Sequence, residues 1–205
     1  MKFWFSFLIL FLVSCHTAFA VELVTDRQLN TKFIDSDNDG LSDFEETEIY
    51  HTNPEDSDTD KDGYLDGHEI GYGFDPNKSF SDKLEKVIRV TLSDQKLKYF
   101  LGPYQVGGIL VSTGRRGHPT PTGEFEILAK YPVHLYKGVG YYYPNTKWNM
   151  MFKYNRAGSF YIHGAYWHHN FGHPMSGGCV NVSYLDMEPL YNWTDIGTKV
   201  YISKE

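Results

Sequence analysis

Cysteine and long apolar runs are both scarce in this sequence of 205 residues. It contains two cysteines, Cys15 and Cys179, which excludes a fold held together by several disulfides. Its N-terminal apolar run, from Phe3 to Val13, is too short to cross a membrane as a helix. What the chain does have is a hydrophobic content of 41%, enough for a globular core, and 16 Tyr and 14 Phe, which favour β structure.

The first twenty residues have the features of a targeting segment. Lys2 supplies a positive charge, the apolar run follows, and Ala18-Phe19-Ala20 is typical of a signal-peptide cleavage site. Residues 1–20 are therefore expected to be a signal peptide, followed by a linker at 21–34, in a protein exported to the periplasm or cell envelope. A second interpretation stays open, because Leu12-Val13-Ser14-Cys15 resembles a lipoprotein box, in which the chain is cut before Cys15 and that residue is lipidated as a membrane anchor.

Cys179 has no intrachain partner under either interpretation. It lies in HPMSGGCVNV, residues 173–182, directly after Gly177 and Gly178. An odd thiol in an exported protein indicates a reactive residue or an intermolecular bridge. A buried core cysteine is the alternative at such a position.

Charge divides the chain into two parts. Residues 21–82 carry 18 acidic and 4 basic side chains, a net of −14, whereas residues 83–205 carry 8 acidic and 14 basic ones, a net of +6. Such a change predicts two modules with different partners. No nucleic-acid partner is expected, and the protein is expected to be a monomer.

The acidic part contains an internal repeat with a period of 23 residues. DSDNDGLSDFEE begins at Asp35 and DTDKDGYLDGHE begins at Asp58, and both fit the pattern D-x-D-x-D-G-x-x-D-x-x-E. This is the spacing of a calcium loop, in which oxygens at alternate positions and a final Glu surround the ion and a Gly makes the sharp turn. The predicted ligands of the first loop are Asp35, Asp37, Asp39, the carbonyl of Leu41, Asp43 and Glu46. Those of the second loop are Asp58, Asp60, Asp62, the carbonyl of Tyr64, Asp66 and Glu69.

Only short helices can flank these loops, because Asn53-Pro54 and Asp75-Pro76 end each helix at the same place in the repeat. The repeats thus resemble the thrombospondin type 3 calcium repeats of bacterial surface proteins rather than a full EF-hand. The resemblance implies a small module over residues 35–80 in which two Ca²⁺ ions have a structural role. The alternative is a solvated acidic linker, which two complete matches disfavour.

Residues 86–205 have the alternating pattern of a mainly β domain. KVIRVTLS and KLKYF, separated by the turn residues Ser93 to Gln95, predict a hairpin. Further strands are predicted in YQVGGILVSTG, GEFEILAKY, GSFYIHG and residues 198–203. The segment from Ser183 to Trp193 predicts one helix with Ser183 as its N-cap.

Cys179 and His163 form a candidate reactive pair. His163 follows the predicted strand SFYI and precedes Cys179 by sixteen residues. An imidazole beside a thiol can remove its proton and leave a nucleophilic thiolate. Gly177 and Gly178 would let a substrate backbone approach, and their N–H groups could hold a developing oxyanion.

At these residues the chain resembles the L,D-transpeptidase catalytic domain. STGRRGHPTPTGEFEI and IHGAYWHHNFGHPMSGGCVNV match that family's pattern of a histidine, a variable stretch and a Ser/Thr-His-Gly-Cys-hydrophobic-Asn motif, over about residues 86–203. The resemblance implies a mainly β fold, a β-sandwich catalytic domain with one or two short helices. It also implies that Cys179 is the nucleophile and His163 the general base, in a motif that Ser176, Gly178 and Asn181 complete.

Gly177 is a departure from this motif, because the family has histidine there. The change leaves Cys179 and His163 intact, but it motivates a second hypothesis, a non-catalytic surface protein that binds the cell wall. A zinc site is a further alternative, although the spacing lacks a compact pattern such as HExxH. That site would use Cys179, His163, His168, His169 and His173. The last three are instead expected to be loop residues over the cleft.

The reaction implied by the resemblance is acyl transfer on peptidoglycan stem peptides. Cys179 would attack the carbonyl of diaminopimelate at its bond to the terminal D-alanine, which leaves. The acyl group of the resulting thioester is then transferred to an acceptor. An amine as acceptor gives a 3-3 cross-link or attaches another amine to the stem. Water as acceptor gives L,D-carboxypeptidase activity. The sequence leaves the acceptor open. The positive net charge of this part suits an acidic polymer of the cell wall.

Overall fold

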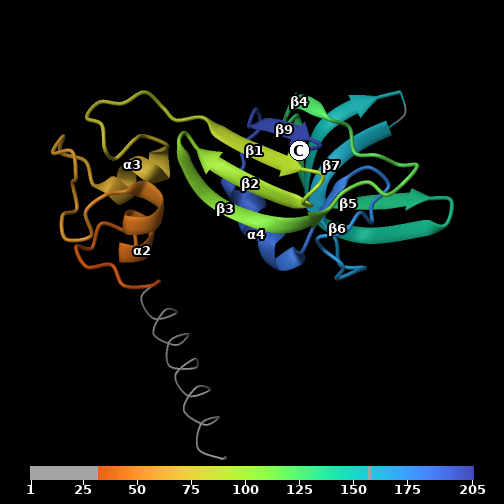
Figure 1. Ribbon diagram of the computed structural model, residues 1–205, viewed down its shortest axis with the longest axis horizontal. Coiled ribbons are helices and arrows are strands. Elements are labelled where there is room, and N and C mark those ends of the chain that lie inside the picture. The colour runs from red at the N-terminus through yellow and green to blue at the C-terminus, as the bar shows by residue number, and fades with distance from the viewer. Residues whose placement is uncertain (1–31, 157) are drawn as a thin grey trace, which may run out of the picture. The chain divides into compact units, whose positions relative to one another are not determined.

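The computed structural model describes residues 32–156 and 158–205 (Figure 1). The predicted signal peptide, Cys15 and most of the predicted linker lie outside the described residues. The chain forms two compact units, with the division between Lys83 and Leu84. None of the described helices is long and apolar enough to cross a membrane.

The N-terminal unit consists of two loop-and-helix repeats. After the first loop, α2 (Asp43–Glu45) continues directly as η1 (Glu46–Tyr50), and after the second loop comes α3 (Asp66–Tyr72). A capping box begins α2, because the side chains of Ser42 and Glu45 each accept the other's backbone N–H. η1 and α3 end at residues with left-handed backbone, His51 and Gly73. The predicted short helices are therefore confirmed.

This unit has little apolar core. Among its described residues, the buried hydrophobic side chains are Leu41 and Tyr50. Most of its other buried side chains are polar or charged, and four of the carboxylates, Asp39, Glu46, Asp66 and Glu69, are at most 6% exposed. Buried charge of one sign is unfavourable unless something compensates it, so the unit needs a partner for these carboxylates.

The C-terminal unit is one nine-stranded sheet in the order β4-β9-β1-β2-β3-β8-β7-β6-β5 (Figure 1). Its strands are antiparallel except for the parallel pairs β1–β9 and β7–β8. The strand bounds are β1 (Lys86–Thr91), β2 (Lys96–Leu101), β3 (Tyr104–Ser112), β4 (Gly123–Glu126), β5 (Ala129–Gly138), β6 (Tyr141–Asn155), β7 (Gly158–Gly164), β8 (Val180–Val182) and β9 (Lys199–Ser203).

The sheet curls, so that strands far apart in its order pack together. Phe125 on β4 contacts Phe152 on β6 with 5.3 Å between ring centroids. One helix, α4 (Tyr184–Trp193), adds the fully buried Met187 and Leu190 to the core. The mainly β fold is therefore confirmed. The predicted helix is confirmed as well, and the hydroxyl of its N-cap, Ser183, accepts the N–H of Asp186 at 3.1 Å.

Two features of the sheet differ from the expected strands. β6 is the longest strand, with 15 residues, yet its sequence has no clear alternation and contains Pro144. Two of its residues, Asn145 and Trp148, have positive φ, so its side chains do not alternate regularly between faces. GEFEILAKY, expected as one strand, contains all of β4 and the start of β5, with Ile127 and Leu128 between the two strands.

Candidate active site

Cys179 directly precedes β8, which lies beside β7. The parallel register sets Ile162 opposite Val180 and His163 opposite Asn181. Adjacent parallel strands therefore bring together two segments that are sixteen residues apart in the sequence. This pairing places Asn181 opposite His163 and Cys179 next to the start of β8.

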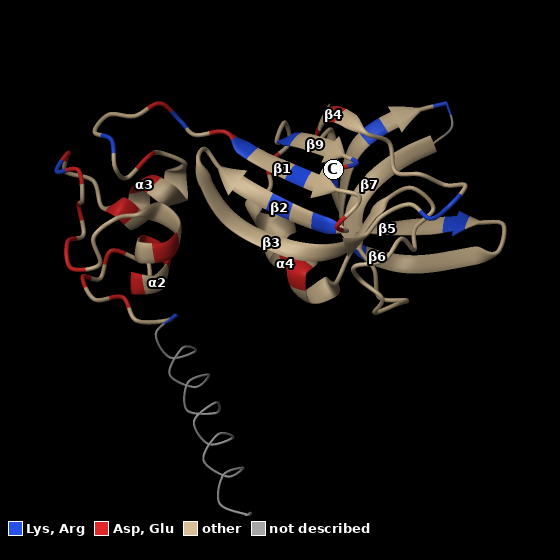
Figure 2. Ribbon diagram, in the orientation of Figure 1, with Lys and Arg blue, Asp and Glu red and all other residues tan. Residues whose placement is uncertain are grey.

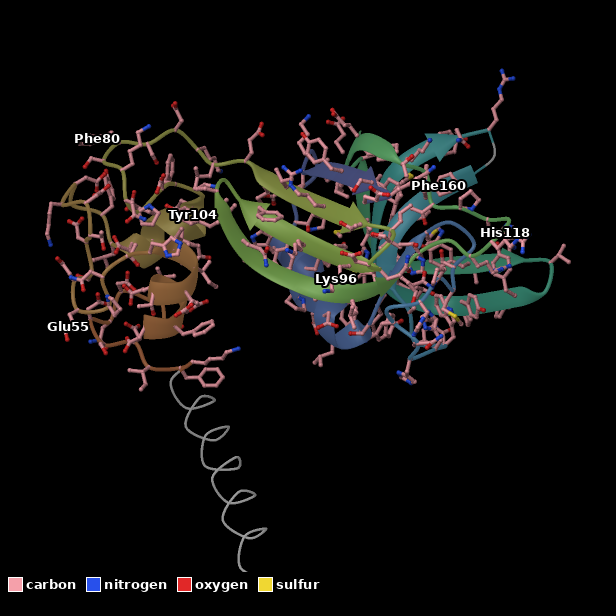
Figure 3. All side chains as sticks on the ribbon, in the orientation of Figure 1. Glu55, Phe80, Lys96, Tyr104, His118 and Phe160 are labelled. Carbon is pink, nitrogen blue, oxygen red and sulfur yellow. The ribbon has the colours of Figure 1, made fainter. Side chains whose placement is uncertain are left out.

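Ser176 and Gly178 determine the shape of the loop before the thiol. The Ser176 hydroxyl donates to the carbonyl of Cys179 at 2.5 Å and accepts the N–H of Gly178 at 3.0 Å. Gly178 has φ +124°, and a Cβ there would lie 2.8 Å from the ring of Phe160 on β7. Phe160 is labelled in Figure 3. The expectation that both glycines offer free N–H groups is therefore corrected at Gly178, whose N–H is bonded to Ser176.

Gly177 is different from its neighbour. A Cβ at Gly177 would meet no atom within 4 Å, and its backbone lacks the left-handed φ of Gly178. A side chain is therefore tolerated at this position on steric grounds. The fold does not require glycine here. The absence of a side chain at Gly177 instead changes which chemical groups lie near the thiol.

His163 is buried and has one ring nitrogen committed. Its Nδ1 lies 2.9 Å from the carbonyl oxygen of Gly164. Since a carbonyl can only accept, Nδ1 carries the proton and Nε2 is left with a lone pair in the neutral ring. Burial lowers the pKa of His163 to about 4, so the ring is neutral at pH 7. The neutral Nε2 is the candidate proton acceptor of the site.

Cys179 is a free, partly exposed thiol. The surrounding protein desolvates the sulfur atom and raises its pKa to about 11, and a hydrogen bond from the backbone N–H of Tyr161 opposes that shift. Within the described part of the chain, no hydrogen bond joins the thiol to His163. The resting pair is therefore a neutral thiol and a neutral imidazole, and the proton has to move when a substrate is bound.

Asn181 reaches one of the three loop histidines. Asn181 is buried, and its Nδ2 lies 3.1 Å from Nε2 of His168. His168 is half-buried and packs against Phe171, with 4.8 Å between ring centroids. His169 and His173 are exposed. Of the three, His168 is thus the one that the structure brings to the motif.

The segments around the thiol carry charge of one sign. No Asp or Glu occurs between Glu126 and Asp186, a range that includes β5, β6, β7, β8 and the cysteine loop. Figure 2 shows the acidic residues concentrated in the N-terminal unit instead. Such a surface favours an anionic substrate.

The acidic residues of the two loops form groups that could hold a metal ion. Ligand atoms within 4.8 Å of one another occur in three groups of described residues: Asp35, Asp37 and Asp39; Asp58, Asp60 and Asp62; and Asp39, Glu46 and Asp66. Across residues 32–156 and 158–205, the groups found contain only Asp and Glu, and none includes Cys179 or a histidine. The zinc alternative therefore gains no support.

Unpaired carboxylate oxygens show that these loops fit a cation. The buried side-chain atoms without a hydrogen-bond partner in the described residues all belong to predicted ligands: Asp37, Glu46, Asp58, Asp60 and Glu69. Burial, followed by neighbouring carboxylates, raises the pKa of both Glu46 and Glu69 to about 7. A divalent cation would satisfy these oxygens and offset their repulsion.

The ninth position of each loop has another role in the structure. The Asp43 carboxylate accepts the N–H and the hydroxyl of Ser36, both at 2.9 Å. Asp66 does the same with Thr59, at 2.9 and 2.6 Å. These two predicted ligands close their loops through hydrogen bonds, and the oxygens left unpartnered are on other residues.

Comparison with known proteins gives a family for each unit. Residues 85–202 match the L,D-transpeptidase catalytic domain, and residues 35–57 and 58–79 match the bacterial TSP3 repeat. No curated protein matches the chain.

Solved structures of L,D-transpeptidases have a similar fold. One from Mycobacterium tuberculosis matches with a TM-score of 0.54 and 24% identity, over 63% of this chain and 63% of that one. A mutant of the Enterococcus faecium enzyme matches with 0.53 and 23%, over 58% and 50%. L,D-transpeptidase 3 from M. tuberculosis, with a faropenem-derived adduct, matches with 0.54 and 22%, over 63% and 66%. The chain thus spans half to two thirds of their lengths.

Proposed function

Because this chain belongs to the L,D-transpeptidase catalytic domain family, we propose that it is a cysteine acyltransferase that acts on the stem peptides of peptidoglycan. The observation that carries the proposal is the position of a free thiol directly before β8 and a buried, neutral imidazole on the adjacent parallel strand β7. Cys179 is the nucleophile and His163 the general base. The absence of acidic residues around them favours a substrate that carries carboxylates.

The proposed first half-reaction forms a thioester and releases an amine. Nε2 of His163 takes the thiol proton as Sγ of Cys179 attacks the carbonyl carbon between diaminopimelate and the terminal D-alanine. The tetrahedral intermediate collapses, the C–N bond breaks, and the imidazolium returns its proton to the amine of D-alanine. The negative oxygen formed on the way needs hydrogen-bond donors. The backbone N–H groups of Gly177 and Cys179 are the candidates, because Gly178 donates to Ser176.

The second half-reaction depends on the acceptor. An amine of a second stem attacks the thioester carbonyl and loses its proton to His163, which gives a 3-3 cross-link and regenerates the thiol. Another amine would be attached to the stem in the same way. Water in place of the amine gives L,D-carboxypeptidase activity, which we keep as the alternative outcome of the same chemistry.

Gly177 supports a second candidate, a non-catalytic protein that binds the cell wall. The family's histidine is absent there, and nothing in the described loop replaces its side chain at that backbone position. The two candidates differ in the thiol. A binding protein keeps its function as Cys179→Ser, whereas an acyltransferase loses it.

The N-terminal unit is proposed to bind Ca²⁺ at both loops, in a structural role. The unpaired oxygens of the predicted ligands, together with the small apolar core, are the support. Export to the periplasm or cell envelope is likewise a proposal, by cleavage after Ala20 or by lipidation of Cys15. We expect the mature protein to be a monomer.

The test uses the chain from residue 21 with tetrapeptide stems. We expect release of D-alanine and an adduct on Cys179 in the intact mass, and neither with Cys179→Ser. Faropenem serves as a second acylating probe, because a structurally similar L,D-transpeptidase carries a faropenem-derived adduct. No adduct from either probe, where a known L,D-transpeptidase reacts, would overturn the proposal.

A further inference from the structure

We propose that Tyr136 is a positioning residue that holds the His163 imidazole in the orientation required of a base. The inference rests on the proposed function, because it concerns proton transfer from Cys179. It assigns a role to β5, a strand that pairs only with β6 at the edge of the sheet.

The two rings are stacked. Their centroids are 4.6 Å apart and their planes differ by 28°. Tyr136 is itself held edge-on by His134, at 4.7 Å, and by Tyr161, at 5.6 Å. The Tyr136 ring is thus fixed by its two neighbours and stacks on the imidazole of His163. It therefore restricts rotation of that imidazole about the Cβ–Cγ bond of His163.

A β-bulge brings Tyr136 to this position. The register between β5 and β6 shifts between His134 and Tyr136. β5 has no hydrogen bonds with β7, so a side chain of β5 has to reach across β6 to contact His163. Bulges change the direction of a side chain and are common next to active sites. The irregularity thus explains how an edge strand supplies a ring to the centre of the site.

A buried asparagine anchors the other end of the tyrosine. The Tyr136 hydroxyl donates to Oδ1 of Asn149 at 3.0 Å. Nδ2 of Asn149 donates to the carbonyls of Thr146, at 2.8 Å, and Tyr131, at 3.1 Å, which determines which amide atom faces the hydroxyl. Asn149 is fully buried and is the β6 partner of His163 in the ladder. The anchor and the imidazole are therefore part of one rigid strand pair.

Two restraints then act on His163. The Gly164 carbonyl binds Nδ1 in the plane of the ring, and Tyr136 covers a face. Together they leave Nε2 as the free nitrogen. A base has to lie within hydrogen-bond reach of its proton, and a ring that rotates freely spends little time there. Removing Tyr136 also admits water to a ring whose neutral form depends on burial.

The test compares Tyr136→Ala with Tyr136→Phe, and uses Tyr154→Ala on β6 as a matched control, since Tyr154 is exposed. Histidine ¹⁵N spectra over a pH range report the tautomer and pKa of His163 directly, with His163→Gln identifying its signal. Acylation by faropenem over the same range reports its action as a base. We expect Tyr136→Ala to raise the pKa of His163, mix its tautomers and slow acylation roughly tenfold or more. Tyr136→Phe keeps the stacked ring and loses only the bond to Asn149, so it should shift the tautomer and pKa less than Tyr136→Ala does, and Tyr154→Ala should leave both unchanged.

Two results would overturn the proposal. One is an unchanged His163 tautomer and pKa in folded Tyr136→Ala; Tyr136→Leu, which keeps apolar bulk without a ring, replaces it if the alanine variant does not fold. The other is a Tyr136→Phe variant as impaired as Tyr136→Ala, which would make the hydroxyl the active group. If wild-type protein is not acylated, the proposed function fails, while the spectra still decide whether Tyr136 orients His163.

Discussion

His163 and Asn181 lie opposite each other across the parallel pair of β7 and β8. This pairing places the buried imidazole beside the strand that Cys179 precedes. His163 is held from within its own strand by the Gly164 carbonyl, at 2.9 Å, and Asn181 contacts His168, at 3.1 Å. His163 and His168 therefore differ in burial and in partners.

The assignment of the base predicts a clear difference between these histidines. We expect His163→Ala to lower the rate of acylation by roughly a hundredfold or more, the usual effect of losing a general base. His168→Ala should lower it by less, because His168 contacts Asn181 rather than occupying the position beside the thiol strand. His169→Ala and His173→Ala, at exposed positions, serve as controls. A tolerated His163→Ala combined with an inactive His168→Ala would show that the base is misassigned.

The pKa of the thiol predicts how the resting protein reacts. The pKa of Cys179 is raised to about 11, so alkylation by iodoacetamide at pH 7 should be about a hundredfold slower than for a thiol of ordinary pKa. The rate should rise steadily through pH 9 and 10. Intact mass after timed alkylation measures it, with free cysteine as the reference. Fast alkylation at pH 6 would instead indicate a preformed thiolate–imidazolium pair.

The same pair contributes to stability in opposite pH ranges. The pKa of His163 is lowered from 6.5 to about 4, so its contribution is fully present above pH 6.5 and is lost as the pH falls through about 4. The pKa of Cys179 is raised from 9.0 to about 11, so its contribution is present below pH 9 and is lost as the pH rises through about 11. Denaturant unfolding of His163→Gln should show a weaker loss of stability between pH 6.5 and 4 than the wild type.

The two glycines before the thiol should respond differently to the same substitution. Gly178→Ala places a Cβ at φ +124° and 2.8 Å from Phe160, and should cost about 1–3 kcal/mol of the free energy of unfolding. Gly177→Ala has open space and should be nearly neutral in stability. Gly177→His, which restores the family residue, should leave acylation unchanged or raise it. Chemical denaturation and faropenem acylation separate these effects, and a folded, inactive Gly177→His would contradict the last of them.

Calcium removal should affect one unit alone. Because unpaired carboxylate oxygens crowd the two loops, chelation should make residues 35–80 sensitive to protease while the catalytic unit keeps its core. Asp37→Asn, at a residue with both oxygens unpaired, should weaken Ca²⁺ binding by about tenfold or more in calorimetry. Asp56→Asn is the matched control, since Asp56 pairs with Lys61 outside the ligand pattern. An identical digestion pattern with and without chelator would count against a structural role.

Features that depend on neighbouring residues in the chain could be predicted from the sequence. Four features each lie within a segment of at most sixteen residues: the spacing of acidic residues in each loop, the hairpin of β1 and β2, the N-cap of α4 at Ser183 and the cysteine motif. Local backbone geometry decides each of them, so local pattern is sufficient. The catalytic roles of Cys179 and His163 stay predictions.

Features that depend on distant contacts were decided by the tertiary structure alone. β7 pairs with β8 so that His163 lies opposite Asn181, Oδ1 of Asn149 accepts the hydroxyl of Tyr136, and Tyr136 reaches His163 across β6. Which donor an oxygen meets, and which ring covers another, depends on strand order, a bulge in register and burial. Strand order, register shifts and burial leave no repeating pattern in the sequence, because they are determined by how all the strands pack around one core.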